Sequence, residues 1–335
     1  MALRFLILGL GSMGKRRIRN LFALGEKNIV GFDPRADRRK EAEEKYGIKT
    51  IEDFQKISTG DFDVLIISSP PDAHGEYIRF ALANKKHFFV EHPTSDDGYA
   101  EIFANKDSNI VKAPSCTMRH YTPVKMIKNF IKDGKIGKIL AFQYHMGQYL
   151  PDWHPWEDYR QVYFSKKETG ACREMLAFEL NWLNWVLDSA PADVSGVITK
   201  VSDLEMDADD IILANLRYGN GILGNVIIDV ISRKPYRTLK ILGTDGVLEW
   251  ERYDFIIKIY DFKSKSTKII PAPRGNPEKG YINEEETYID EIKAFLDAIY
   301  GRAEYPFSFK ENFLNLKTLF ALEEAFKTKK YQKIL

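Results

Sequence analysis

The stretch from Phe5 to Gly14, FLILGLGSMG, decides the fold of this chain. Its first four residues are apolar and are typical of a short buried strand, and the glycines at positions 9, 11 and 14 follow at once. Glycines after a strand allow a tight turn and let a phosphate group approach the N-terminus of the next helix. The stretch therefore predicts the phosphate loop of a dinucleotide-binding fold. Because glycine turns also follow strands for structural reasons alone, the motif needs a second signal.

Asp33 supplies that signal, because it ends the apolar run VGFD about 20 residues after the glycine loop. A carboxylate at this position accepts hydrogen bonds from the adenosine ribose and repels a 2′-phosphate. Arg35 and Arg38 follow closely and would suit such a phosphate, so the sequence favours NAD and leaves NADP open. The contacts that we assign to this half of the cofactor are Gly9, Gly11, Ser12, Met13, Gly14, Asp33 and Arg35.

Short apolar runs alternate with amphipathic helical segments through the first third of the chain. Runs of this kind, without polar alternation, suit a parallel sheet that helices cover on both faces. The expected fold class is therefore an α/β Rossmann domain, which we place at residues 1–118. Its strand-like runs lie at 5–8, 29–32, 64–67 and 87–90.

Residues 119–335 are expected to form an α+β domain that binds substrate and mediates oligomerisation. Strand-like runs between residues 194 and 270 are separated by GNG at 219–221 and GTDG at 243–246, which favour hairpins. These patterns predict a large, open, mainly antiparallel sheet. Helical spacing returns between residues 284 and 327. Packing of the C-terminal helix against the first domain is one arrangement that we leave open. A helix at 123–133 and a strand at 139–149 open the domain.

Composition narrows the class of partner. The 335 residues suit two domains, and the 49 basic and 48 acidic residues nearly cancel, which argues against a nucleic-acid surface. Cys116 and Cys172 are too few for a disulfide framework and lack zinc-site spacing, so we expect no metal and a reducing, cytoplasmic setting. No run approaches the roughly 18–20 apolar residues of a membrane span. We therefore expect a soluble protein whose partners are small molecules or its own copies.

Three segments carry a family resemblance. GLGSMG at 9–14, SSPPDAHGEYIRFAL at 68–82 and VEHP at 90–93, in this order, resemble the glucose-fructose oxidoreductase, inositol dehydrogenase and rhizopine catabolism family, written Gfo/Idh/MocA. The resemblance implies that substrate, most often a sugar or cyclitol, lies between the nicotinamide and the helix-bearing face of the second sheet. It also implies a homodimer or homotetramer, because similar proteins cover an apolar open sheet face by pairing. Residues implied beside the nicotinamide are Ser69, Pro70, His74, Glu91 and His92.

The sequence departs from the family at its expected lysine. The family's Glu-Lys-Pro is Glu91-His92-Pro93 here, so His92 stands where a lysine usually assists proton transfer. An imidazole, with an ordinary pKa near 6.5, exchanges protons at neutral pH and is a chemically suitable substitute. The alternative is a histidine that merely packs beside the cofactor.

A second departure lies in the helical segment GACREMLAFELNWLNWV, where Glu174 and Phe178 occupy the places of the family's aspartate and catalytic histidine. Phenylalanine cannot accept a proton, so the usual mechanism does not transfer to Phe178. Glu174 is our second catalytic candidate beside His92, although the helix dipole alone also favours a glutamate near a helix start. Asn181, on the same helical face, would position a substrate hydroxyl.

The loop GQYLPDWHPWEDYR at 147–160 combines aromatic rings with hydrogen-bonding groups. Aromatic faces suit the C–H side of a sugar ring, and charged groups suit its hydroxyls, while the alternative is a subunit contact. Arg119 precedes this region and suits either a carboxylate ligand or a structural ion pair. The substrate contacts that we expect are Arg119, Tyr149, Trp153, His154, Phe178 and Asn181.

Three functions are consistent with these features. The leading one is an NAD(P)-dependent oxidoreductase that transfers a hydride at a carbinol carbon of a sugar derivative. The second keeps NAD bound and uses transient oxidation to assist elimination or glycosidic cleavage without net redox change. The third is a non-catalytic sensor of NAD or sugar, which the loss of both the lysine and the histidine favours.

Overall fold

The computed structural model describes residues 2–107, 109–278, 281 and 283–334. The chain divides into two compact units. The first consists of Met1–Thr117 and Gly275–Asn312, and the second of Met118–Arg274 and Phe313–Leu335. The second unit is therefore not one continuous segment from residue 119 to 335, because residues 275–312 return to the first unit. This return contributes directly to the site described below.

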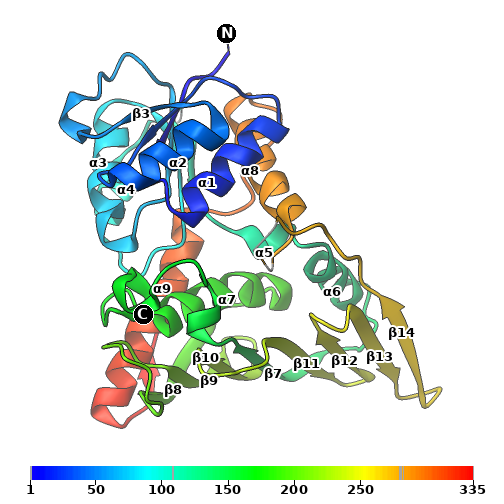
Figure 1. Ribbon diagram of the computed structural model, residues 1–335. Helices are drawn as coiled ribbons and strands as arrows, with labels where there is room; N and C mark the ends of the chain where they lie inside the picture. Colours follow the sequence, from blue (N-terminus) through cyan, green and yellow to red (C-terminus); the bar gives the residue numbers. More distant parts are fainter. Residues whose placement is uncertain (1, 108, 279–280, 282, 335) are drawn as a thin grey trace. The chain divides into compact units, whose positions relative to one another are not determined.

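A parallel sheet forms the centre of the first unit (Figure 1). Its described strands run in the order β3-β2-β1-β4-β5-β6, so the strand order reverses between β1 and β4. In open α/β sheets such a reversal marks the crevice where ligands bind. The four strands expected from apolar runs are confirmed with the expected bounds. The strands are β1 Phe5–Leu8, β2 Ile29–Phe32, β3 Lys49–Ile51, β4 Val64–Ile67, β5 His87–Val90 and β6 Lys112–Pro114.

Helices cover both faces of this sheet, which explains its uninterrupted apolar strands. On one face Phe5, Ile7 and Ile66 pack against side chains of α1, α2 and α8. On the other face α3 contacts β4 and β5, and α4 packs beside α3. The helices are α1 Ser12–Ala23, α2 Ala36–Tyr46, α3 His74–Ala83, α4 Tyr99–Ala104 and α8 Glu285–Ile299, with short 3-10 turns η1 Phe54–Lys56 and η2 Pro71–Ala73.

An open nine-stranded sheet forms the second unit, in the order β14-β13-β12-β11-β7-β10-β9-β8-β15. All its described pairs are antiparallel except β7 with β10, and the expected turns at 219–221 and 243–246 join β9 to β10 and β11 to β12. The strand expected at 139–149 ends at Gly147. The strands are β7 Ile139–Gly147, β8 Pro191–Thr199, β9 Ile211–Tyr218, β10 Leu223–Asp229, β11 Tyr236–Gly243, β12 Gly246–Glu251, β13 Ile256–Asp261, β14 Ser266–Pro271 and β15 Gln332–Lys333.

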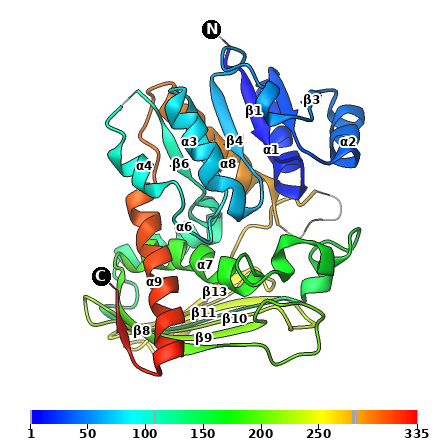
Figure 2. The ribbon, with the colours of Figure 1, turned by 90° about the vertical axis from the view of Figure 1, so that its left-hand side faces the viewer.

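One face of this sheet carries helices, and α7 lies across it (Figure 2). The leucine stripe expected on α7 is confirmed, since Leu176, Leu180, Leu183 and Leu187 are all buried. The helices are α5 Thr117–His120, α6 Thr122–Lys132, α7 Ala171–Leu187 and α9 Phe309–Thr328, with 3-10 turns η3 Leu150–Asp152, η4 Tyr159–Gln161 and η5 Tyr163–Ser165. None of the helices in the described residues is long and apolar enough to cross a membrane.

The opposite face of the nine-stranded sheet carries no helix within the part of the chain that the structure describes. The expected apolar face is mixed, with both apolar and polar side chains exposed. Leu223 and Leu242 are exposed there, but Gln143, Lys240 and Glu249 are exposed on the same face. Strand alternation explains the mixture, because a strand with one face in the core is free to present polar residues on the other.

Gly14 tests how tightly α1 packs on β1. A Cβ atom at Gly14 would lie 1.8 Å from the carbonyl oxygen of Gly9, which the backbone can relieve only by moving helix and strand apart. We expect Gly14→Ala to lower the free energy of unfolding in urea by more than about 3 kcal/mol. Gly25→Ala is the control, because Gly25 has φ +86° but open space around it, and should cost about 1 kcal/mol. Equal losses in both variants would contradict the close approach.

Candidate active site

Asp33 ties the glycine loop to the start of α2. Its carboxylate is 3% exposed and accepts the Leu10 N–H at 2.8 Å and the Arg35 N–H at 2.9 Å, through different oxygens. A carboxylate oxygen can accept more than one hydrogen bond, so these contacts leave acceptor capacity for a ribose hydroxyl. Asp33 therefore shapes the loop as well as presenting a charge beside it.

The two arginines after Asp33 differ in position. The Arg35 guanidinium is exposed and pairs with Asp37 at 2.5 Å. Arg38 instead lies 3.8 Å from the Asp33 carboxylate, and a Cβ atom at Gly11 would lie 3.3 Å from its Nη1. Of the two, Arg38 is the side chain that lies over the glycine loop.

The carboxyl ends of β4 and β5 bring together the residues expected beside the nicotinamide. Ile67 pairs with Val90, and the Glu91 N–H donates to the Ile67 carbonyl at 3.0 Å. Ser68 and Glu91 thus follow adjacent strand ends, and the Ser68 hydroxyl lies 3.4 Å from the Glu91 carboxylate. Beyond them, Ser69 and Pro70 lead into η2 and His74 begins α3.

His74 and His92 are buried imidazoles with defined tautomers. His74 Nε2 lies 3.0 Å from the Ser69 carbonyl, and His92 Nδ1 lies 3.2 Å from the Pro93 carbonyl. Because a carbonyl only accepts, these nitrogens carry the protons. Burial lowers the pKa of His74 to about 4 and that of His92 to about 3, so both rings are neutral at pH 7. His92 therefore carries its lone pair on Nε2.

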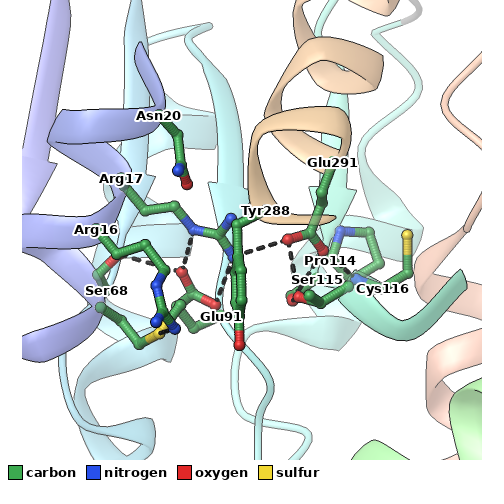
Figure 3. Close-up of polar contacts among 12 residues, drawn as sticks. Arg16, Arg17, Asn20, Ser68, Glu91, Pro114, Ser115, Cys116, Tyr288 and Glu291 are labelled. Carbon is green, nitrogen blue, oxygen red and sulfur yellow. Dashed lines mark hydrogen bonds and ion pairs between the residues drawn. The ribbon is translucent and has the colours of Figure 1, made fainter. Parts of the chain in front are cut away.

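Arg17 of α1 lies fully buried between two carboxylates (Figure 3). Its Nε and Nη2 donate to Glu91 at 2.6 and 3.0 Å, and Nη2 lies 2.8 Å from the carboxylate of Glu291 on α8. Burial opposes the charge of the guanidinium, but the two carboxylates outweigh burial and raise its pKa above the ordinary value. The side chain is therefore a permanent buried cation under the end of β5.

Glu291 also fixes the segment that follows β6. Its carboxylate accepts the Ser115 hydroxyl at 3.0 Å and the Cys116 N–H at 2.5 Å (Figure 3). It also accepts the Thr117 hydroxyl at 2.9 Å. These residues are the last of the first unit before the chain enters the second. One buried carboxylate thus joins α8, α1 and the end of the unit.

A second charge cluster is built around Arg16, the residue before Arg17 in α1. Arg16 is 3% exposed, and its Nε donates to Glu285 at 2.8 Å, while Arg19 Nη2 reaches the same carboxylate at 3.1 Å. The Arg16 guanidinium lies 4.0 Å from the ring centre of Tyr288, and its Nη1 contacts the sulfur of Met13 at 3.7 Å. This cluster is therefore adjacent to the glycine loop.

In the second unit, Glu174 lies in the first turn of α7 and is 9% exposed. The Tyr163 hydroxyl donates to it at 3.3 Å. Further along the helix, Arg119 Nε donates to the Asn181 side chain at 2.7 Å, so these two predicted substrate contacts bind each other. Phe178, on the same helix between them, is partly buried.

The loop after β7 is compact and aromatic. Trp153 packs edge-on against Phe164 at 5.1 Å, and His154 stacks on Trp156 at 5.1 Å. His154 Nδ1 lies 3.1 Å from Glu157. Tyr149, at the start of the loop, lies 3.7 Å below the Arg233 guanidinium.

A buried acid of α7, Glu179, is not among the residues predicted from the sequence. Glu179 is fully buried and accepts from Tyr144 at 2.6 Å, Trp182 at 2.5 Å and Arg237 at 2.7 Å. Glu179 lies between Phe178 and Leu180 and shortly before Trp182, and these large apolar neighbours are a signal of burial. Its ion-pair partner Arg237 lies on β11, far along the chain, and has no such local signal. Among the described residues, no group of three or more His, Cys, Asp or Glu side chains is suited to hold a metal ion.

Two family descriptions match the chain. "Oxidoreductase family, NAD-binding Rossmann fold" matches residues 3–120, and "GFO/IDH/MocA C-terminal domain" matches residues 124–249. The chain belongs to the Gfo/Idh/MocA family. As a member of this oxidoreductase family, it carries the family's NAD-binding Rossmann fold, in agreement with the expectation from the glycine loop and Asp33.

Similar proteins include several dehydrogenases. Levoglucosan dehydrogenase of Pseudarthrobacter phenanthrenivorans is 28% identical over 64% of this chain, and the match spans 63% of that protein, slightly under two thirds of its length. Myo-inositol 2-dehydrogenase of Thermotoga maritima is 24% identical over 73% of this chain and 74% of its own. Inositol 2-dehydrogenase of Salmonella typhimurium is 26% identical over 84% of this chain and 91% of its own.

Solved structures share the fold across both units. An oxidoreductase from Agrobacterium radiobacter, in complex with NAD+, L-tartaric acid and magnesium, has a TM-score of 0.87 at 16% identity, covering 100% of this chain and 99% of that one. A levoglucosan dehydrogenase complex with NADH has a TM-score of 0.84 at 20% identity, covering 99% of each chain. At these identities the likeness supports the fold.

The neutral histidines predict a pH dependence of stability. A histidine of the unfolded chain has a pKa near 6.5, whereas that of folded His92 is about 3. The stabilisation is fully present above pH 6.5 and is lost as the pH falls toward 3, because only the unfolded state takes up the proton. We expect the stability lost between pH 7 and 5 in urea unfolding to be about 2 kcal/mol smaller in His92→Gln. An unchanged pH dependence would refute the buried neutral state.

The Arg17 ion pairs predict a large loss of stability on their removal. Arg17→Met leaves Glu91 and Glu291 without their cation, and breaking a buried pair in this way typically costs roughly 3–5 kcal/mol. Lys15→Met is a matched control on the same helix, because the partner Glu41 is half exposed and the pair should contribute less than about 1 kcal/mol. Denaturant titration of both variants measures the difference. Similar losses in the two would show that burial adds nothing to the Arg17 pairs.

Proposed function

We propose that this protein is an NAD-dependent oxidoreductase that acts on a CH–OH group of a sugar, a cyclitol or a derivative of one. The observation that carries the proposal is His92, a buried neutral imidazole at the carboxyl end of β5 in a dinucleotide-binding sheet. β5 neighbours β4, at which the strand order reverses. The similarity to levoglucosan and inositol dehydrogenases supports the substrate class.

The residues present fit a dinucleotide. The Gly14 backbone lies so close to Gly9 that a Cβ atom has no space, which is the tight loop that pyrophosphate binding requires. Asp33 keeps acceptor capacity for a ribose hydroxyl and opposes a 2′-phosphate, which favours NAD, although Arg38 beside it leaves NADP open. The residues that would hold the cofactor are Gly9, Gly11, Ser12, Met13, Gly14, Asp33, Arg35, Ser69, Pro70, His74, Glu91 and His92.

The cofactor, when bound, supplies the hydride acceptor or donor. The protein's own contribution is proton transfer, which we assign to Nε2 of His92, since its other nitrogen donates to the Pro93 carbonyl. With a pKa of about 3, this buried ring is a weaker base than the ordinary imidazole that the sequence suggested. Glu174, held by the Tyr163 hydroxyl, would orient a substrate hydroxyl or exchange a proton with it. Phe178 contributes an apolar surface.

Substrate contacts are assigned to the second unit. Trp153 and Tyr149 offer aromatic faces to the C–H side of a sugar ring, and His154 offers hydrogen bonds to its hydroxyls. Arg119 Nε donates to the Asn181 side chain at 2.7 Å. We therefore assign these two residues to positioning α7 beside the substrate, and not to binding a carboxylate of the substrate.

We further propose a homodimer or homotetramer in the cytoplasm. The mixed polar and apolar face of the nine-stranded sheet, with Leu223 on β10 56% exposed and with Lys240 and Glu249 exposed on β11 and β12, suits a subunit contact.

A substrate screen tests the proposal. The full chain is incubated with NAD+ or NADP+ and a panel of sugars, sugar derivatives and cyclitols, and the absorbance of reduced nicotinamide is followed. We expect turnover with at least one of them, and a loss of kcat in His92→Gln of about a hundredfold or more with little change in NAD+ affinity. His92→Lys, which restores the family's residue, should recover part of kcat.

Other outcomes favour the alternatives. Full activity in His92→Gln would remove His92 from the mechanism. Dinucleotide binding without turnover across the panel would favour a sensor, which the absence of the family's lysine and histidine at positions 92 and 178 supports. Conversion of a sugar without net NADH formation would favour a lyase or glycosidase that uses bound NAD.

A further inference from the structure

We propose that two charge clusters along α1 select the oxidised form of the dinucleotide, so that NAD+ binds more tightly than NADH. This inference rests on the proposed function. The inner cluster is Arg17 with Glu91 and Glu291, and the outer cluster is Arg16 and Arg19 with Glu285.

The inner cluster carries a net negative charge. It contains one guanidinium and two carboxylates. Both carboxylates act as acceptors: Glu91 from Arg17 and Ser68, and Glu291 from Arg17, a backbone N–H and two hydroxyls. With Arg17 and Glu291 fully buried, little water screens the remaining negative charge.

The outer cluster carries a net positive charge. Arg16 and Arg19 share the single carboxylate of Glu285. The Nη2 of Arg16 is buried and has no hydrogen-bond partner among the described residues, while its Nη1 contacts Met13 of the glycine loop. The N-terminus of α1 adds its own partial positive charge at the same end.

The order of the strands aligns these clusters with the dinucleotide. Asp33 follows β2, so the adenosine half lies on that side of β1, and the pyrophosphate lies at the glycine loop. The nicotinamide half then extends to the other side of the strand reversal, toward the ends of β4 and β5, where Ser68 and Glu91 meet. The negative cluster therefore lies at the nicotinamide end and the positive cluster at the pyrophosphate end.

Only one of these two ends differs between the oxidation states. The nicotinamide ring of NAD+ is positively charged and that of NADH is neutral, whereas the pyrophosphate has the same charge in both. A buried negative charge near the ring therefore favours NAD+, and a positive charge near the pyrophosphate favours both forms equally. For one net charge near the ring in a partly screened site we expect roughly a fivefold preference.

Binding measurements on the full chain test the inference. Dissociation constants for NAD+ and for NADH are measured by calorimetry for the wild type, Glu291→Gln and Glu285→Gln. Glu291→Gln removes one negative charge without contacting the cofactor, and should lower the ratio Kd(NADH)/Kd(NAD+) by roughly fivefold. Glu285→Gln removes a charge of the same sign from the outer cluster, and should leave that ratio unchanged while altering both affinities together.

Each outcome is decisive. An unchanged ratio in Glu291→Gln, or an equal shift in Glu285→Gln, overturns the inference while leaving dinucleotide binding intact. If Glu291→Gln does not fold, as judged by its melting transition, the wild type still decides: a ratio above one supports the inference and a ratio below one overturns it. Failure of the wild type to bind either dinucleotide would instead refute the proposed function.

Discussion

The structure of the first unit depends on the burial of the Arg17 guanidinium. A buried cation is tolerated only when carboxylates surround it, and here they come from the end of β5 and from α8. This requirement determines which elements must meet: the helix after the glycine loop, the strand end that carries His92, and a helix from residues 285–299. The same carboxylate on α8 then orders Ser115–Thr117. A single electrostatic constraint thus joins the cofactor loop, the proton-transfer candidate and the exit from the unit.

Most of the first unit could be predicted because its signals are local. Four strand bounds followed from apolar runs of four residues each, and the glycine loop and Asp33 lie within about 20 residues of one another. The partners of Arg17 could not be predicted in the same way, because Glu91 lies 74 residues away and Glu291 much further. The motif around Glu91 indicated a cofactor contact but not an ion pair with Arg17, and the local sequence of Glu291 does not differ from that of an exposed helical glutamate. Only the folded topology brings them together.

In the second unit, too, features with local sequence signals could be predicted and contacts between distant residues could not. Helical spacing identified the buried leucine stripe of α7, and glycine-rich turns identified two hairpins. That Asn181 binds Arg119, and that Glu179 binds Arg237, depends on pairings across 62 and 58 residues. The expected apolar outer face of the sheet proved to be mixed, since a strand reveals which of its faces is buried but not what the other face contacts. The roles of residues in catalysis are harder still to predict from the sequence, because they also depend on the identity of the substrate.

The return of residues 275–312 to the first unit has a consequence for biosynthesis. Ribosomes release the chain from its N-terminus, so α1, with its buried Arg16 and Arg17, is complete long before Glu285 and Glu291 are made. During that interval Arg16 lacks the carboxylate of Glu285, and Arg17 has Glu91 but not Glu291. One face of the nascent Rossmann sheet also lacks α8, one of the three helices that cover it. We expect the first unit to reach its native state only after most of the chain has emerged. Completion of its fold therefore waits for residues 275–312, although its strands are made much earlier.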